Sequence, residues 1–367
     1  MNLELSPEQS TLHELLARLV ADATPPDKFA ELFDRDEAAA SDPTLWSRLT
    51  GLGMIGLSVS EDLGGGGAGW IEETILFEEL GAGLSPSPAF GTVALCLPLL
   101  AQAPDATALV GDVLSGSRRY AFAGAGEHAR SLFGDPAPAP GIRIDSTPGG
   151  LRVTGTRSWV LDGADADAFL VPASSPSGPT VLLIPADDRV SISPMPTVDP
   201  SRRMVRAEYS HAAATPLLGP DLAPAALATA DRLGMLLACA EAVGISERML
   251  ATTVDYAQTR TQFGRPIGSY QAVSHQLADT YVEIELARSL VRWAAVEPND
   301  TTVDAAAAFV LPAAVQICER AIQLHGGIGM TWDAPLHRYY KRALLLQAFA
   351  PRTTHLRERI AATLLDA

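Results

Sequence analysis

The sequence has few cysteines, few basic residues and no long uncharged apolar run. Its three cysteines, Cys96, Cys239 and Cys318, form an odd and widely spaced set in apolar surroundings. Secreted domains held together by disulfides contain more closely spaced cysteines, whereas isolated buried thiols are typical of proteins from reducing compartments. We therefore interpret these residues as small core side chains and not as a disulfide framework.

Basic residues are also scarce, because 27 Lys and Arg stand against 43 Asp and Glu, which gives a net charge of −16 at pH 7. The acidic residues are spread along the chain and are not gathered in one tail. No stripe of Lys and Arg is available to neutralise phosphates, so a nucleic acid partner is disfavoured. The simplest interpretation of the acidity is solubility.

The third absence concerns membranes and export. No uncharged apolar stretch reaches the roughly 20 residues that a bilayer-spanning helix needs. Residues 1–9 contain neither a basic region nor an apolar run, unlike a signal peptide. From these features we expect a cytoplasmic protein with no membrane span.

Apolar residues are plentiful enough for more than one core. They make up 47% of the 367 residues, and a chain of this length usually forms two or three domains. Residues 1–117 are predicted to be helical. Ser6, followed by Pro7 and then by Gln9 at the third helical position, has the pattern of a helix N-cap. The apolar residues after it recur at helical spacing.

The amino-acid composition changes in residues 118–220, where Pro and Gly are frequent. Leu151–Thr156 alternates apolar and polar residues as a half-buried strand does, and Pro148–Gly150 provides a turn. A compact antiparallel β domain is predicted for this region. Residues 221–367 are predicted to be helical again, beginning near Pro224. The predicted fold class is therefore mainly α with a central β domain, in three domains.

Two glycine-containing clusters distinguish the last helical region. Arg260–Ile267 reads Arg-Thr-Gln-Phe-Gly-Arg-Pro-Ile, and Gln323–Gly329 reads Gln-Leu-His-Gly-Gly-Ile-Gly; these are the first and second motifs. Glycine is costly in helical sequence unless something must approach the backbone closely. A cationic Arg, two Gln amides and a bare Gly-Gly backbone suit a cofactor that carries phosphates. Each motif taken alone is also explained as a loop beside a helix end.

In this order and spacing, the two motifs resemble the C-terminal domain of the acyl-CoA dehydrogenase family of flavoenzymes. The resemblance extends over nearly the whole chain, through segments that look like the family's turns and strands: Leu57–Gly67, Glu78–Gly81, Arg157–Gly163 and Asp199–Gly219. It implies a helical N-domain, a β-barrel-like middle domain and a C-terminal four-helix bundle. It also implies FAD at a subunit interface, a tetramer, an acyl-CoA substrate and an electron-transfer flavoprotein as electron acceptor. It implies no metal.

The resemblance assigns FAD contacts to eight residues. Arg260 would meet the FAD pyrophosphate through its planar guanidinium. Trp159 would lie beside the isoalloxazine, although a buried aromatic in a strand explains this residue as well. The other contacts would follow the dinucleotide, which such residues usually meet in a neighbouring subunit: Gln262, Phe263, Gln271, Gln323, Gly326 and Gly327.

The chain departs from the family pattern at the catalytic base. Family enzymes remove two hydrogens across the Cα–Cβ bond of the thioester, and a carboxylate accepts the α-proton. Ala350 stands at the usual Glu position, and Gly234 stands where other members carry the base, with Met235 in place of a neighbouring Arg. Tyr120–Glu127 replaces the middle-domain flavin signature, and Leu161 stands where a flavin-bonding Thr is common.

Another carboxylate could take the place of the missing base. Asp231 lies about one helical turn before Gly234, although a solvated pair with Arg232 near a helix start explains it as well. Glu241 is a second candidate, in the middle of an apolar helix, where family members often have a Glu with no catalytic role.

Three further polar residues near the second motif are predicted to be structural. Asp333 and His337 are expected in a loop that closes over the cofactor. His325, beside Gly326, is expected to hold the position of the glycine turn and not to take part in chemistry.

These observations predict an FAD-dependent acyl-CoA dehydrogenase, acting as the base-lacking subunit that completes the FAD site of a heteromeric enzyme. Bacterial enzymes of this kind act on bulky thioesters such as steroid side chains, with a second acyl-CoA dehydrogenase-like subunit. One alternative is a non-catalytic interaction protein that retains only the fold. Another is a related flavin oxidase or monooxygenase.

Overall fold

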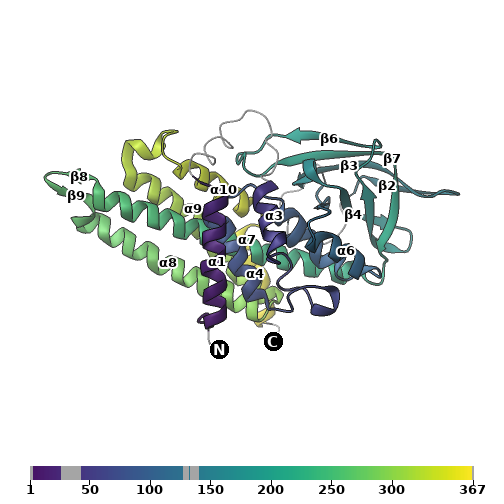
Figure 1. Ribbon diagram of the computed structural model, residues 1–367, viewed down its shortest axis with the longest axis horizontal. Coiled ribbons are helices and arrows are strands. Elements are labelled where there is room, and N and C mark those ends of the chain that lie inside the picture. The colour runs from purple at the N-terminus through teal and green to yellow at the C-terminus, as the bar shows by residue number, and fades with distance from the viewer. Residues whose placement is uncertain (1–2, 26–42, 127–131, 133–139, 366–367) are drawn as a thin grey trace. The chain divides into compact units, whose positions relative to one another are not determined.

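The computed structural model describes residues 3–25, 43–126, 132 and 140–365 of the chain (Figure 1). Glu127, the last residue of the stretch in place of the middle-domain signature, lies outside the described residues. Two compact units are present. One comprises Met1–Asp22, Thr74–Leu84 and Met235–Ala367, and the other comprises Ala23–Glu73 and Ser85–Gly234.

The first part of the chain is helical, as predicted. Reciprocal hydrogen bonds begin its first helix, because Oγ of Ser6 accepts from the N–H of Gln9 at 3.2 Å and Oε1 of Gln9 accepts from the N–H of Ser6 at 2.9 Å. The described helices of this part are α1 (Pro7–Ala23), α3 (Pro43–Gly51), η1 (Glu61–Leu63), α4 (Trp70–Gly83), the π-helix η2 (Phe90–Cys96), α5 (Leu97–Leu100) and α6 (Ala106–Leu114).

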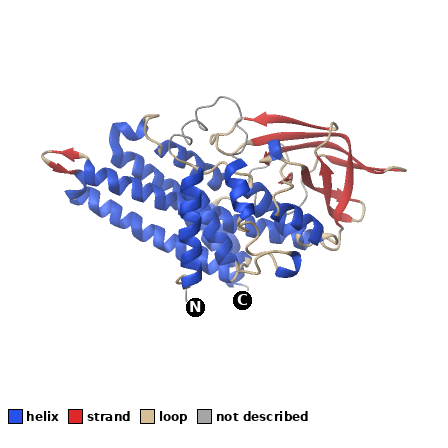
Figure 2. Cartoon of the chain, in the orientation of Figure 1, coloured by secondary structure: helices blue, strands red, loops and turns tan. Residues whose placement is uncertain are grey.

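A seven-stranded sheet follows, with a short 3-10 helix, η3 (Gly163–Asp165), inserted between two of its strands (Figure 2). Its path is β1-β4-β5-β7-β3-β2, and β6 also pairs with β7. Only the β1–β4 pair is parallel among these described strands. The strands are β1 (Tyr120–Phe122), β2 (Ile142–Thr147), β3 (Gly150–Leu161), β4 (Ala168–Ser175), β5 (Gly178–Pro185), β6 (Val190–Met195) and β7 (Met204–Leu218).

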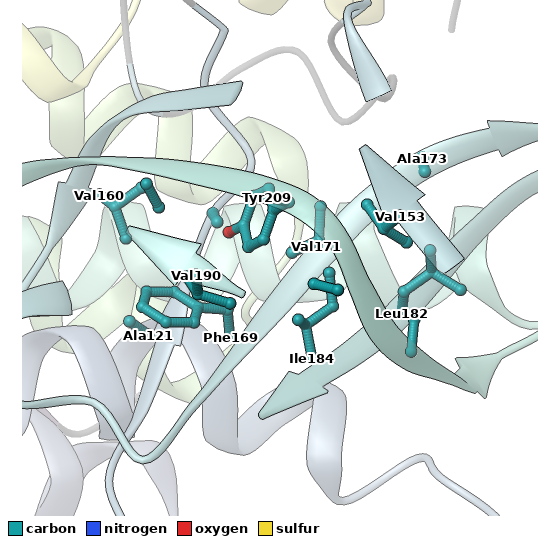
Figure 3. Close-up of a cluster of buried hydrophobic side chains, with 14 of the residues drawn as sticks. Ala121, Val153, Val160, Phe169, Val171, Ala173, Leu182, Ile184, Val190 and Tyr209 are labelled. Carbon is teal, nitrogen blue, oxygen red and sulfur yellow. The ribbon is translucent and has the colours of Figure 1, made fainter. Parts of the chain in front are cut away.

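Apolar side chains from several of these strands form one buried cluster (Figure 3). Phe169 and Tyr209 meet edge to face in it, with ring centroids 6.1 Å apart. The guanidinium of Arg157 is fully buried and donates at 3.0 Å to the carbonyl oxygens of Pro140 and Pro172. Burial lowers the pKa of Arg157 to about 10. The sheet therefore has an apolar core with one cation held by backbone carbonyls.

The last part of the chain is helical, again as predicted. A long helix, α7 (Ala223–Thr259), begins one residue before Pro224. A side-chain amide caps a later helix, α9, because Oδ1 of Asn299 accepts from the N–H of Thr302 at 3.0 Å. The elements after α7 are β8 (Thr261–Gln262), β9 (Arg265–Pro266), η4 (Ile267–Ser269), α8 (Gln271–Val296), α9 (Asp300–His325), η5 (Gly326–Met330), α10 (Leu336–Phe349) and α11 (Thr353–Leu365).

Two glycines let α4 and α7 approach each other backbone to backbone. A Cβ added to Gly244 would lie 1.7 Å from the carbonyl oxygen of Glu78, and one added to Gly81 would lie 2.1 Å from the carbonyl oxygen of Glu241. Neither distance leaves room for a side chain, so both positions require glycine for steric reasons.

One stretch among the described residues, Asp300–Met330, is long and apolar enough to cross a membrane by length and composition. Its apolar window is 72% buried within the chain, however. A buried core helix of a globular domain meets the same criterion, and we interpret this stretch as such a helix.

Glu73 on α4 generates a prediction about stability and pH. Its side chain is buried, Oε2 accepts from the N–H of Ser58 at 2.9 Å, and Oε1 has no hydrogen-bond partner among the described residues. Burial raises the pKa of this carboxyl above its ordinary value of 4.5. The folded state therefore binds the proton more tightly, and stability falls as the pH rises from 4.5 through the folded-state pKa.

We expect Glu73→Gln to increase the free energy of unfolding at about pH 8, because the neutral amide carries no desolvated charge and still accepts from Ser58. The gain should shrink as the pH falls toward the ordinary carboxyl pKa. Urea unfolding at several pH values measures it, with Glu61→Gln, an exposed carboxyl of the same unit, as the control. A loss of stability at about pH 8 would show that the charged form is stabilised in the folded protein.

Candidate functional site

The first motif forms a small exposed hairpin at the end of α7. The N–H of Arg260 bonds to the carbonyl oxygen of Tyr256 at 2.8 Å, which closes the last turn of the helix. The strands β8 and β9 then pair Gln262 with Arg265 across the turn. Phe263 and Gly264 occupy that turn with φ of +51° and +82°, as the two central residues of a type I′ turn do. Figure 1 shows this hairpin beside the outer end of α8.

The second motif forms the end of α9 and the short helix η5. Gly326 follows the last residue of α9 with φ +65°, where glycine has no steric cost. A Cβ added to Gly326 or Gly327 would meet no heavy atom within 4 Å, so this backbone is open to an incoming group. Gly329 differs, because its Cβ would lie 2.6 Å from the carbonyl oxygen of Ile322. The first two glycines thus expose backbone, and the third allows close packing.

The structure brings the two motifs together through Tyr256 and His325. Their rings stack with centroids 4.3 Å apart and planes 19° from parallel, and the Tyr256 hydroxyl donates to the His325 carbonyl oxygen at 3.3 Å. Tyr256 lies one helical turn before Arg260, and His325 directly precedes Gly326. The contact between Tyr256 and His325 therefore connects Arg260 of the first motif with the glycine turn of the second motif.

His325 has the structural position expected of it. Its side chain is buried, and Nδ1 lies 2.8 Å from the Ala321 carbonyl oxygen, which can only accept, so this nitrogen carries the proton. Burial lowers the pKa of His325, and the hydrogen bond to Ala321 opposes that shift. A neutral imidazole stacked on Tyr256 suits a role in holding the turn.

The predicted FAD contacts of both motifs, together with Gln271 at the start of α8, are exposed in this unit. Phe263 is 93% exposed, which is unusual for a large apolar side chain. Other large apolar side chains that follow Gly327 are exposed as well: Ile328, Met330 and Trp332. A guanidinium, amide donors and bare glycine backbone form a donor set that fits a diphosphate, and the exposed apolar groups suit an adjacent surface.

Trp159 belongs to the other unit, where the backbone holds it in an unusual conformation. Its φ is +57°, and the register between β3 and β7 shifts between Arg157 and Val160, as at a β-bulge. Its N–H donates to the sulfur of Met195 at 3.2 Å, and its side chain is half-buried. Left-handed backbone is uncommon for a bulky residue, and bulges near active sites re-aim side chains. The conformation favours a positional role over simple core packing.

The turn after Trp159 is fixed by contacts within the same unit. Asp162 has φ +55°, and its Oδ2 accepts from the N–H of Gly91 at 3.1 Å, at the start of the π-helix. Leu161, which stands where a Thr is common in the family, is buried. It therefore contributes to packing and offers no polar group.

No carboxylate stands at either base position, and the structure describes what is there. Gly234 is buried within α7, and Ala350 is buried just after α10. Asp231 is partly exposed on α7. Glu241 is fully buried, and its Oε1 accepts from the guanidinium of Arg342 at 2.5 Å. The pairing agrees with the structural interpretation of Glu241, because a base must be reachable by the substrate.

One expectation about the residues after the second motif was wrong. His337 was predicted to lie in a loop, but it occupies the first turn of α10, with its ring edge against Trp332 at 4.6 Å between centroids. Pro335, directly before this helix, is of a residue type that is common at helix starts. Asp333 does lie in a loop, as predicted, and it is exposed.

Sequence reasoning also missed two tyrosines near the motifs. Tyr256 carries the stack on His325, and Tyr270 contacts three residues of the hairpin. An aromatic one turn before Arg260, and another just before Gln271, were the available signals. Their spacing alone does not reveal which backbone group each hydroxyl meets.

A helical part, a mainly antiparallel sheet and a second helical part define the fold class of the chain. Family models agree: the acyl-CoA dehydrogenase N-terminal domain matches residues 6–107, and the acyl-CoA dehydrogenase C-terminal domain matches residues 231–365. The chain belongs to the acyl-CoA dehydrogenase family.

Similar proteins include both sequences and solved structures. The chain is 35% identical to acyl-CoA dehydrogenase IpdE2 of Mycobacterium tuberculosis over 92% of its own length and 91% of that protein. It matches one chain in the crystal structure of the ChsE4–ChsE5 complex from Mycobacterium tuberculosis with a TM-score of 0.86 at 29% identity. The match covers 100% of this chain and 100% of that chain. A variant of the Tcur3481–Tcur3483 steroid ACAD matches with a TM-score of 0.84 at 28% identity, over 98% of each chain.

The buried pair of Glu241 and Arg342 generates a second prediction. We expect Arg342→Met to destabilise the protein by about 3–5 kcal/mol, because it leaves the buried Glu241 carboxylate without this cation. The double variant Glu241→Leu/Arg342→Met should recover most of that loss, since buried ion pairs are often replaceable by apolar residues of similar volume. Denaturant unfolding of Arg342→Met, of Glu241→Leu and of the double variant measures the coupling free energy between the two side chains. Additive losses would mean that the two side chains do not depend on each other.

Proposed function

We propose that this chain is the base-lacking subunit of a heteromeric, FAD-dependent acyl-CoA dehydrogenase, in which it completes the FAD site of a second subunit. The observation that carries the proposal is the exposed donor set of the two motifs, joined through Tyr256 and His325. Exposure of these groups is what a chain needs in order to contact a nucleotide held mainly by its neighbour. The chain would act in the cytoplasm, on an acyl-CoA thioester.

In this proposal, Arg260 pairs with the pyrophosphate, where a planar guanidinium provides charge-assisted hydrogen bonds. The open backbone at Gly326 and Gly327 lies against the adenosine diphosphate half, with Gln323 beside it. Gln262 and Phe263 of the hairpin and Gln271 at the start of α8 contact the dinucleotide. Trp159, in the other unit, is proposed separately as a contact of an isoalloxazine ring, as the family resemblance implies. When bound, FAD supplies the redox chemistry by accepting the β-hydrogen as hydride.

The need for a partner follows from what the chain lacks. Neither Gly234 nor Ala350 can accept the α-proton, and Glu241 is paired and buried. The second subunit would supply the base, the rest of the flavin pocket and the contact with an electron-transfer flavoprotein. The chain's likeness to proteins solved as the ChsE4–ChsE5 complex and as the Tcur3481–Tcur3483 steroid ACAD supports this arrangement, and it favours a bulky acyl group such as a steroid side chain.

The direct test is purification with and without the partner, found by affinity capture from the native host. The chain alone should be nearly colourless and inactive, and the assembled complex should be yellow and should oxidise acyl-CoA. The absorbance of bound flavin near 450 nm gives FAD per complex. A chain that is fully yellow alone and oxidises acyl-CoA without help would reject the heteromeric assignment.

Arg260 provides the matched mutational test. In the assembled complex, Arg260→Ala should weaken FAD binding on the order of 10- to 100-fold, because a charged hydrogen bond to the pyrophosphate is lost. Arg260→Lys should bind FAD with an affinity between those of the natural chain and Arg260→Ala, since an ammonium keeps the charge but loses the planar fork. Arg357→Ala, which removes an exposed Arg of α11, is the control. Unchanged FAD retention in Arg260→Ala would favour a non-catalytic interaction protein that retains only the fold.

A further inference from the structure

We infer that Tyr270 is a positioning residue that fixes the first-motif hairpin in the conformation that meets FAD. The inference rests on the proposed function for the FAD contacts themselves. It adds a residue that makes none of those contacts and a means by which the hairpin is held before the nucleotide arrives.

The hairpin has little to hold it in place. Its two strands contribute only two residue pairs, Thr261 with Pro266 and Gln262 with Arg265, and a two-stranded pair of this length is marginal in water. Every residue from Thr261 to Pro266 is exposed, so burial of apolar surface contributes little. The turn also places Phe263 at a φ of +51°, which costs a bulky residue free energy.

Three side-chain contacts of the hairpin converge on Tyr270. Its hydroxyl donates to the carbonyl oxygen of Gln262 at 3.0 Å. The guanidinium of Arg265 lies over its ring, 4.0 Å from the centroid. The ring of Phe263 meets it edge to face, with centroids 6.5 Å apart and planes at 84°. One side chain therefore contacts both strands and the turn.

Tyr270 is itself well anchored. It is the N-cap residue of α8, its carbonyl oxygen accepts from the N–H groups of Val273 at 2.9 Å and Ser274 at 3.0 Å, and its own N–H bonds to Ile267 at 3.1 Å. The residue is half-buried, whereas the hairpin is exposed. Tyr270 thus connects the hairpin to a 26-residue helix.

Fixing the hairpin in advance affects binding through entropy. A flexible segment that becomes ordered on binding reduces affinity, so a hairpin already held at Gln262 and Phe263 loses less freedom when FAD arrives. Removing the hydroxyl alone should weaken FAD binding about 2- to 10-fold, the effect of one hydrogen bond. Removing the whole side chain should weaken it on the order of 100-fold, because the hydrogen bond, the cation–π contact and the aromatic contact are lost together.

The experiment compares Tyr270→Phe and Tyr270→Ala with the natural chain in two measurements. The first is the FAD dissociation constant of the assembled complex, from flavin fluorescence. The second needs no FAD: chymotrypsin cleavage of the Phe263–Gly264 bond in the isolated full chain, followed by mass spectrometry. Tyr281→Phe, an exposed tyrosine about three turns further along α8, is the control for both.

Faster cleavage and weaker FAD binding in Tyr270→Ala, with Tyr270→Phe intermediate in both, would support the inference. Cleavage separates positioning from general destabilisation, because the thermal unfolding of the variants should change little while the hairpin alone becomes accessible. If Arg260→Ala loses FAD but Tyr270→Ala binds it as the natural chain does, this inference is overturned and the proposed function stands. If neither variant affects FAD, both are wrong.

Discussion

The close approach of α4 and α7 is the constraint on which the site depends. No side chain fits at Gly81 or Gly244, so the close approach of the two backbones depends on these two glycines. Beside this contact, Glu241 and Arg342 form a buried ion pair that requires α7 and α10 to keep their positions. Because α7 continues without interruption to Thr259, a position fixed in the packed interior also fixes Tyr256 and Arg260 at its end.

Hydrogen-bonded charges connect the packed helices of this unit, whereas the end of α7 presents its side chains to the exterior. Arg288 hydrogen-bonds to Glu78 at 2.9 Å and to Glu247 at 2.7 Å, which connects α8 with α4 and α7. At the end of α7, polar and apolar groups are instead presented to the exterior, and the stack of Tyr256 on His325 holds the two motifs together. A rigid scaffold that carries an exposed donor set at one end is suited to binding a ligand that another subunit shares.

The order of helices, sheet and helices was predictable from the sequence, because local signals agree with the fold. The capping pattern at Ser6 forms as predicted, and strand alternation in Leu151–Thr156 marks part of β3. The bulge at Trp159 was not predictable, since its left-handed backbone depends on the register of β3 against β7, which is a tertiary property. The same holds for Tyr270, whose partners are set by a turn geometry that its own sequence position does not reveal. The three-domain division and the roles of the site residues stay predictions.

This chain is proposed to contact a flavin dinucleotide that a second subunit holds. Photolabelling of the assembled complex with FAD that carries an azide on its adenine ring tests this contact, with the labelled peptides identified by mass spectrometry. We expect label on this chain within Arg260–Phe263 or Gln323–Gly329, and loss of that label when unmodified FAD competes. Competed label found on the second subunit alone, with both segments of this chain unmodified, would contradict it.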